Sequence, residues 1–294
     1  NDQKKILCTI AMVSDLVKEI AADHAVVTTL IRGQHDPHSY QLVKGDDEKF
    51  TRADCIFYCG LGLEHGPSLA AQLHNNPKAH SLGGFLAKKN PAALISVDGV
   101  TDPHIWMDVQ LWSQTIPFIV DTLSTLDPSH ADQFRENGKV LTNKLHALHT
   151  TMKETFQHCP KEKRYLVTTH DAFHYFGRSY LAEADELQNG QWQLRVQAPE
   201  GLAPESQLST ADIHRLVEHL ITKKISVVFP ESNVSYDSIK KLVDACQMRG
   251  FQVHIAQKPL FADAMGPQGS DADSYEKMML HNTKTIHHEL CTGS

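Results

Sequence analysis

The chain has 294 residues, of which 41% are hydrophobic and 21% charged, enough for one large domain or two of ordinary size. This composition excludes an intrinsically disordered chain, and no apolar run approaches the roughly 18 residues that a transmembrane helix needs. The net charge of −7 argues against a non-specific nucleic-acid binder, because the phosphate backbone would repel the protein.

The first 127 residues alternate short β-rich runs with helical patterns. Apolar positions at helical spacing predict a helix over residues 13–20. The predicted strands are residues 6–11, 25–31, 54–59 and 92–97. Strand–helix alternation of this kind indicates a parallel sheet flanked by helices.

A long helix is predicted next, over residues 128–159. Asp127 is a candidate N-cap, and Pro128 suits the first helical position. Apolar residues then recur at steps of four, three and four, which is the period of an amphipathic helix. They are Leu141, Leu145, Leu148 and Met152. A helix of roughly 30 residues would be about 45 Å long.

After Pro160 the alternation restarts. Strands are predicted at residues 165–169, 225–230 and 251–256, and helices at 210–221, 235–246 and 273–290. We therefore predict an α/β protein of two Rossmann-like lobes, each with a mainly parallel sheet, joined by one rigid helix. The predicted organisation is an N-terminal metal-binding lobe (1–127), a connecting helix (128–159) and a C-terminal metal-binding lobe (160–294).

Two Asp-Pro-His tripeptides, 36–38 and 102–104, each follow a predicted strand. Proline fixes its own φ and restricts the residue before it, so each imidazole is held on a stiff turn. A stiff turn suits a metal ligand, because little ordering is needed when the ion binds. Histidine is abundant here, with 19 copies, but the position of a histidine after a strand is more informative than the number.

Ligands of open α/β sheets bind where loops leave the carboxyl ends of strands. Four such loops supply three imidazoles and one carboxylate, a set that suits Zn²⁺, Mn²⁺ or Fe²⁺. The predicted metal ligands are His38, His104, His170 and Asp263, two from each lobe. His35 is a rival to His38, and His174 a rival to His170. The other histidines are interpreted as solvated.

The six cysteines are too few and too scattered for a disulfide scaffold, although one or two bridges are compatible with an oxidising compartment. Cys55 and Cys59 are interpreted as small buried strand residues, since no second cysteine pair completes a zinc ribbon. The chain begins without Met, which we interpret as a processed or trimmed N-terminus.

Several motifs resemble those of the extracytoplasmic solute-binding proteins of bacterial ABC importers for zinc, manganese and iron, the cluster A-I type. The motifs are D-P-H-S-Y-Q, G-L-G-L-E, D-P-H-I-W-M-D, T-H-D-A-F-H-Y-F and P-E-G-L-A-P-E-S. They stand in family order over nearly the whole chain, and the run from Asp36 to Asp46 is similar to the chlamydial members. The resemblance implies two four-stranded lobes, a rigid backbone helix and one inter-lobe metal.

The resemblance also places His38, His104, His170 and Asp263 where the family has its ligands. His170 would put the chain in the three-histidine subset, since some members have Glu there. Dedicated zinc importers usually carry a long His-rich loop, whereas residues 65–80 hold only three histidines. This departure favours manganese or iron, although zinc outcompetes both for such ligands on intrinsic affinity.

The function implied is high-affinity capture of one divalent metal ion (Mn, Fe or Zn) as cargo, without catalysis. We also expect delivery to the ABC permease of the same importer, a monomeric state, and a periplasmic or extracytoplasmic location. We further expect that a signal peptide has been removed, or that the protein was anchored to the membrane through an N-terminal segment that has been removed. Two alternatives remain open: a metal-dependent hydrolase using the same cleft, and an adhesin with a structural metal. No H-E-x-x-H motif supports a hydrolase.

Overall fold

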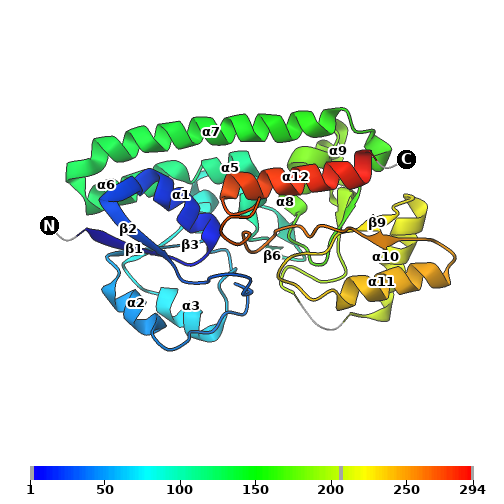
Figure 1. The fold of residues 1–294 in the computed structure, drawn as a ribbon, viewed down its shortest axis with the longest axis horizontal. Helices are drawn as coiled ribbons and strands as arrows, with labels where there is room; N and C mark the ends of the chain where they lie inside the picture. Colours follow the sequence, from blue (N-terminus) through cyan, green and yellow to red (C-terminus); the bar gives the residue numbers. More distant parts are fainter. Residues whose placement is uncertain (1–2, 205–207, 293–294) are drawn as a thin grey trace.

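The computed structural model describes residues 3–204 and 208–292. Two α/β lobes lie next to each other beneath the long helix α7 (Ala131–Gln157), which runs across both of them (Figure 1). This arrangement and its parallel strand pairs confirm the predicted fold class. The motif P-E-G-L-A-P-E-S lies within the second lobe, with its Glu205 and Ser206 outside the described residues.

The first lobe is built on a four-stranded parallel sheet in the order β2-β1-β3-β4. Its strands are β1 (Lys4–Cys8), β2 (Ala25–Thr29), β3 (Cys55–Tyr58) and β4 (Ala79–Ser81). The helices of this part of the chain are α1 (Ala11–Ala21), α2 (Asp46–Arg52), α3 (Pro67–Leu73), α4 (Leu82–Lys89), α5 (Val109–Ser113) and α6 (Ile116–Leu126). Because every strand runs the same way, the loops after β2 and β3 leave one edge of the sheet.

The predicted fourth strand was wrong. Residues 92–97 form part of a 3-10 turn and then β5 (Ser96–Val97), which pairs antiparallel with β6 (Val100–Thr101) in a small hairpin. The fourth strand of the sheet is instead β4, a three-residue segment of partly buried residues with the sequence Ala-His-Ser. A short polar segment becomes a strand here because it pairs with β3, whereas the local sequence gives no strand signal.

The second lobe contains two parallel strand pairs. β7 (Leu166–Val167) pairs with β8 (Val196–Gln197), and β9 (Val227–Val228) pairs with β10 (His254–Ile255). The amide of Phe229 donates to the carbonyl oxygen of Val167 at 2.9 Å and joins the two pairs. The helices that accompany them are α8 (His174–Phe176), α9 (Ala184–Asn189), α10 (Thr210–Thr222), α11 (Asp237–Met248) and α12 (Tyr275–Cys291).

Helix α7 has the predicted amphipathic pattern. A separate 3-10 turn, Pro128–His130, precedes it, and the predicted apolar positions Leu141, Leu145, Leu148 and Met152 are all buried. Gly138 lies where α6 crosses α7: a Cβ there would approach Val120 Cγ2 to 2.6 Å. The single glycine of the predicted helix therefore allows α6 and α7 to pack closely.

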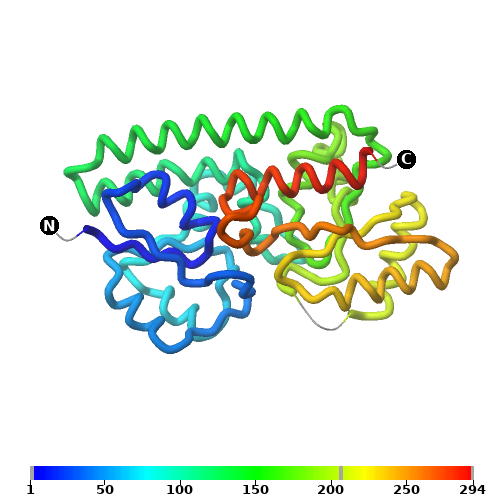
Figure 2. The backbone as a smooth tube through the Cα atoms, in the orientation of Figure 1, coloured from blue at the N-terminus to red at the C-terminus, as the bar shows by residue number. Residues whose placement is uncertain are grey.

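The C-terminal helix α12 returns across the molecule and packs against α7 (Figure 2). At its start, the amide of Tyr275 donates to Asp15 Oδ2 on α1 at 2.9 Å. At its end, Cys291 forms a disulfide with Cys159, which follows α7. Contacts to the first lobe at one end and a covalent bond to α7 at the other thus fix α12 across both lobes.

The other four cysteines, Cys8, Cys55, Cys59 and Cys246, are free and buried. Cys55 lies in β3 and Cys59 directly follows it, which confirms their interpretation as buried residues of a strand region. Among the described residues, no helix is both long and apolar enough to cross a membrane.

Candidate metal site

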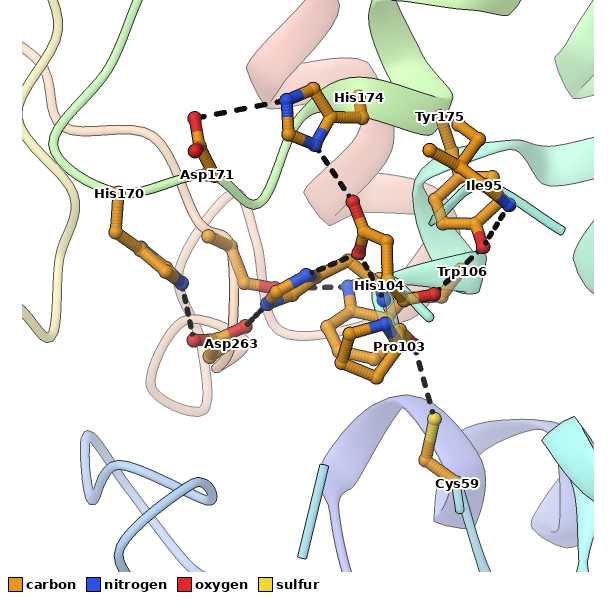
Figure 3. Close-up of polar contacts among 12 residues, drawn as sticks. Cys59, Ile95, Pro103, His104, Trp106, His170, Asp171, His174, Tyr175 and Asp263 are labelled. Carbon is orange, nitrogen blue, oxygen red and sulfur yellow. Dashed lines mark hydrogen bonds and ion pairs between the residues drawn. The ribbon is translucent and has the colours of Figure 1, made fainter. Parts of the chain in front are cut away.

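The four predicted metal ligands meet in one buried cluster. One ring nitrogen or carboxylate oxygen from each of His38, His104, His170 and Asp263 lies within 4.8 Å of the other three. The Asp263 carboxylate is central: Oδ2 lies 3.1 Å from His38 Nε2 and 2.9 Å from His170 Nε2, and Oδ1 lies 3.2 Å from His104 Nε2. Figure 3 shows His104 and His170 directed at Asp263 from two sides. All four residues are at most 3% exposed.

The two Asp-Pro-His turns have the same local geometry. In the first, Asp36 Oδ1 accepts the amide of His38 at 2.9 Å, and in the second, Asp102 Oδ1 accepts the amide of His104 at 2.9 Å. Each aspartate therefore bonds to its own backbone two residues further on, which stiffens the turn beyond the effect of proline. The stiff turn expected from each Asp-Pro-His tripeptide is therefore present, and these hydrogen bonds add a second physical cause of its stiffness.

Two of the histidines are oriented by carboxylates behind the cluster. His104 Nδ1 lies 2.7 Å from Asp102 Oδ1, and His170 Nδ1 lies 2.5 Å from Glu231 Oε1. A carboxylate can only accept, so we assign a proton to Nδ1 of His104, and the short contact with Glu231 favours the same assignment for His170 although that pair is not aligned as a hydrogen bond. Nε2 of both rings then faces the cluster. Glu231 also accepts the amide of His170 at 2.7 Å. This carboxylate–histidine arrangement is typical of metal ligands.

The loop that carries Asp263 is held by residues of the first lobe and of α12. Trp106 Nε1 donates to the carbonyl oxygen of Ala262 at 2.9 Å. The Asn282 side chain pairs with both backbone groups of Phe261, at 2.9 and 2.8 Å. Asp263 is thus positioned by hydrogen bonds to the backbone on its N-terminal side, which leaves its carboxylate directed at the three imidazoles.

Some close pairs in the cluster have hydrogen-bond geometry, such as His38 Nε2 with His104 Nε2 and with Asp263 Oδ2, and others do not. His170 Nε2 and Asp263 Oδ1 are buried without an aligned hydrogen-bond partner, although neighbouring N and O atoms lie at 2.9 and 3.2 Å. Tetrahedral zinc with Zn–N of about 2.0 Å has ligand–ligand edges of about 3.3 Å, close to the separations here.

Charge and burial act in opposite directions on the histidine pKa values. Burial alone would lower the pKa of His104, but Asp263 and Asp102 outweigh it and raise the pKa to about 9. Burial is likewise overcome at His170, whose pKa is raised well above the usual value by Glu231 and Asp263. Without metal, protons on these rings therefore balance the carboxylates near neutral pH.

His38 and Asp263 complete this picture. Burial lowers the pKa of His38, and the attraction of Asp263 offsets only part of that effect. For Asp263, burial favours the neutral acid, but His170, His38 and His104 together hold its pKa well below the ordinary range. The cluster therefore favours an ionised carboxylate surrounded by imidazoles.

Neither rival histidine belongs to the cluster. His35 is exposed, and its ring lies 6.2 Å from that of Tyr40. His174 is buried but bonds to Asp102, behind His104. His65, interpreted from the sequence as solvated, is indeed exposed, yet its ring centre lies 5.8 Å from that of the predicted ligand His38.

Sequence reasoning missed Glu231 and the role of His174. Glu231 directly follows the predicted strand 225–230, so the rule that selected the predicted ligands, polar residues after strand ends, would also have selected Glu231. His174 contacts a residue 72 positions away, and no local pattern indicates that pairing.

Comparison with known proteins identifies the family of the chain. The family described as "ZnuA: Zinc-uptake complex component A periplasmic" matches residues 6–289. The chain belongs to this family. The resemblance inferred from the motifs is thereby confirmed, and with it the expectation that the relatives are metal-binding components of ABC importers.

Individual relatives cover almost the whole chain. "Metal-binding protein YtgA" of Chlamydia muridarum is 38% identical over 285 residues, 97% of this chain and 85% of that protein. "Manganese-binding lipoprotein MntA" of Bacillus subtilis is 33% identical over 97% of this chain and 89% of that protein. The expected similarity to chlamydial members is therefore confirmed.

Solved structures show the same fold. The crystal structure of Fe(III)-bound YtgA from Chlamydia trachomatis superimposes with a TM-score of 0.92 at 35% identity, covering 98% of both chains. The periplasmic zinc-binding protein TroA from Treponema pallidum gives a TM-score of 0.88 at 30% identity, covering 99% of this chain and all of that one. Relatives of one fold are thus named for iron, manganese and zinc.

Proposed function

We propose that this protein captures one transition-metal ion, Mn, Fe or Zn, with high affinity outside the cytoplasmic membrane and delivers it to the permease of an ABC importer. The observation that carries the proposal is the convergence of His38, His104, His170 and Asp263 in one buried cluster. Three imidazoles and one carboxylate suit all three metals. Because a relative is named as Fe(III)-bound, ferric iron belongs among the ions to be tested.

The geometry supports holding an ion rather than catalysis. A catalytic zinc site usually has three protein ligands and an open position for water. Here four protein side chains face one another at separations of 2.9–3.2 Å, all of them buried. The family is one of binding components of metal uptake, and no observation favours a hydrolase or an adhesin.

We propose that residues 1–127 and 160–294 act as two metal-binding lobes and that residues 128–159 connect them. His38 and His104 come from the first part, and His170 and Asp263 from the second, so the ion would join the lobes. We further propose that the protein is a monomer and that it is periplasmic or anchored to the membrane. The permease would dock on the face where the ligand loops open.

The direct test is metal analysis of the protein purified from its native compartment, followed by titration of the metal-free protein with Mn²⁺, Fe²⁺, Fe³⁺ and Zn²⁺. We expect one ion per chain. The His104→Ala variant should lose most of its affinity, whereas His149→Ala should keep it, because His149 bonds to Tyr180 and not to the cluster. Full affinity in the His104→Ala protein would remove that residue from the ligand set.

Metal affinity should fall as the pH is lowered. A ligand nitrogen must lose its proton to bind metal, and the pKa of His104 without metal is about 9. Below pH 9 the ion therefore displaces at least one proton, so affinity should drop about tenfold per pH unit for each proton displaced. Calorimetry in buffers of different ionisation enthalpy would measure the proton release. Affinity that stays flat from pH 7.5 to 5.5 would contradict the three-histidine site.

A further inference from the structure

The carboxylate of Asp102 links the ligand His104 to a histidine of the other lobe. Its Oδ1 accepts from the amide and from Nδ1 of His104, at 2.9 and 2.7 Å, and its Oδ2 accepts from Nδ1 of His174 at 2.8 Å. Figure 3 shows the other nitrogen of His174 directed at Asp171, 3.7 Å away. Asp102 is fully buried, so each of its oxygens depends on such a partner.

The next residue, Tyr175, bonds to the backbone on both sides of the same loop. In the β5–β6 hairpin, Ile95 and Asp102 form the pair that follows Ser96 and Thr101, and the amide of Asp102 donates to the carbonyl oxygen of Ile95 at 2.8 Å. The reciprocal hydrogen bond, from the amide of Ile95 to the carbonyl oxygen of Asp102, is replaced by two hydrogen bonds of the Tyr175 hydroxyl. This hydroxyl accepts from the amide of Ile95 at 3.0 Å and donates to the carbonyl oxygen of Asp102 at 2.7 Å.

Both residues lie a few positions after the ligand His170. His174 and Tyr175 begin α8, and only three residues separate His170 from His174. The segment that supplies one ligand from the second lobe therefore also holds the turn that supplies a ligand from the first lobe. This link passes through side chains and hairpin backbone, so it exists without an ion.

We infer that His174 and Tyr175 are positioning residues that form an inter-lobe clamp on the Asp102–Pro103–His104 turn and slow the dissociation of bound metal. The inference rests on the proposed metal-binding function and adds to it. Without the His174 donor, Asp102 Oδ2 would be buried without a partner. Asp102 would then reorient, and His104 would lose the anchor that directs its Nε2 at the ion.

The chain offers matched variants for a test. Asparagine places an amide nitrogen close to the position of the histidine Nδ1, so His174→Asn should keep the donor to Asp102, while His174→Leu removes it. Tyr180 is the control for Tyr175: it is also buried, and its hydroxyl also accepts a backbone amide of the first lobe, that of Val109 at 3.0 Å. Its other partner is His149, which is outside the cluster.

The experiment loads each full-length variant with Co²⁺ and follows release into excess chelator by stopped-flow absorption. We expect His174→Leu and Tyr175→Phe to release Co²⁺ about tenfold faster, in the range known for outer partners of metal ligands. Their Co²⁺ d–d spectra should change as well. His174→Asn should restore most of the slow release, and Tyr180→Phe should match the wild type in rate and spectrum.

Two results would overturn the clamp. One is equal release from His174→Leu, Tyr175→Phe and the wild type. The other is equally fast release from Tyr180→Phe, which would indicate general loosening between the lobes instead of positioning of His104. Failure of the wild-type protein to bind Co²⁺ or any of the cargo metals would overturn the proposed function, and the clamp with it.

Discussion

Replacing Asp263 with asparagine is expected to reduce metal affinity more than 100-fold while leaving the fold intact. Asp263 is the proposed ligand that lies within 3.2 Å of all three histidines, through its two oxygens. Asparagine has nearly the same shape, so the change removes the negative charge and little else. Loss of an outer partner typically costs about 10–100-fold in affinity, and loss of a charged ligand should exceed that range.

The charge matters because of how the site is balanced. The three imidazoles hold the pKa of Asp263 well below its usual range, which favours the ionised carboxylate. A metal ion that displaces the protons of the cluster is therefore attracted by the ionised Asp263 carboxylate. Because the site is buried, this attraction is poorly screened. A neutral amide provides no such attraction.

The matched control is Asp271→Asn, which makes the same charge change on an exposed residue of the following loop. Titration of metal-free proteins with Zn²⁺ and Mn²⁺ would give the affinities, and circular dichroism would show that both variants are folded. An Asp263→Asn protein that binds metal as tightly as the Asp271→Asn protein would exclude Asp263 from the ligand set.

The part of this site that could be predicted from sequence is the part encoded locally. An Asp-Pro-His turn carries its own constraint: proline restricts the backbone, and the aspartate bonds to the histidine amide two residues on. Position after β2 also places His38 beyond the carboxyl end of the main sheet, whereas His104 follows the separate β5–β6 hairpin, so only its turn identified it. His38 and His104 could therefore be identified without any knowledge of their neighbours.

What could not be predicted depends on contacts between distant segments. The strand β4 is three residues long and gains its conformation from pairing with β3, whereas the apolar segment 92–97, which looked more like a strand, lies outside the main sheet. The bond between His174 and Asp102 spans 72 positions. The pairing of Cys159 with Cys291 spans 132, and six cysteines permit many alternatives.

That disulfide underlies the second large effect: a Cys159→Ser, Cys291→Ser double variant should be less stable by about 2–5 kcal/mol. The bridge closes a loop of 132 residues, so breaking it gives the unfolded chain many more conformations. It also releases the end of α12 from α7. Because α12 packs on α7 and its first residue bonds to α1, the change should weaken the frame shared by both lobes.

Chemical denaturation of the metal-free proteins would measure this effect as a lower midpoint. Reduction of the wild type should reproduce it, and reduction of the double variant should change nothing further, because Cys8, Cys55, Cys59 and Cys246 are already free thiols. Metal affinity at 25 °C should stay the same, since neither Cys159 nor Cys291 contacts the ligands. Equal midpoints for the oxidised wild type and the double variant would mean that packing of α12 on α7, not the covalent bond, holds the C-terminal helix in place.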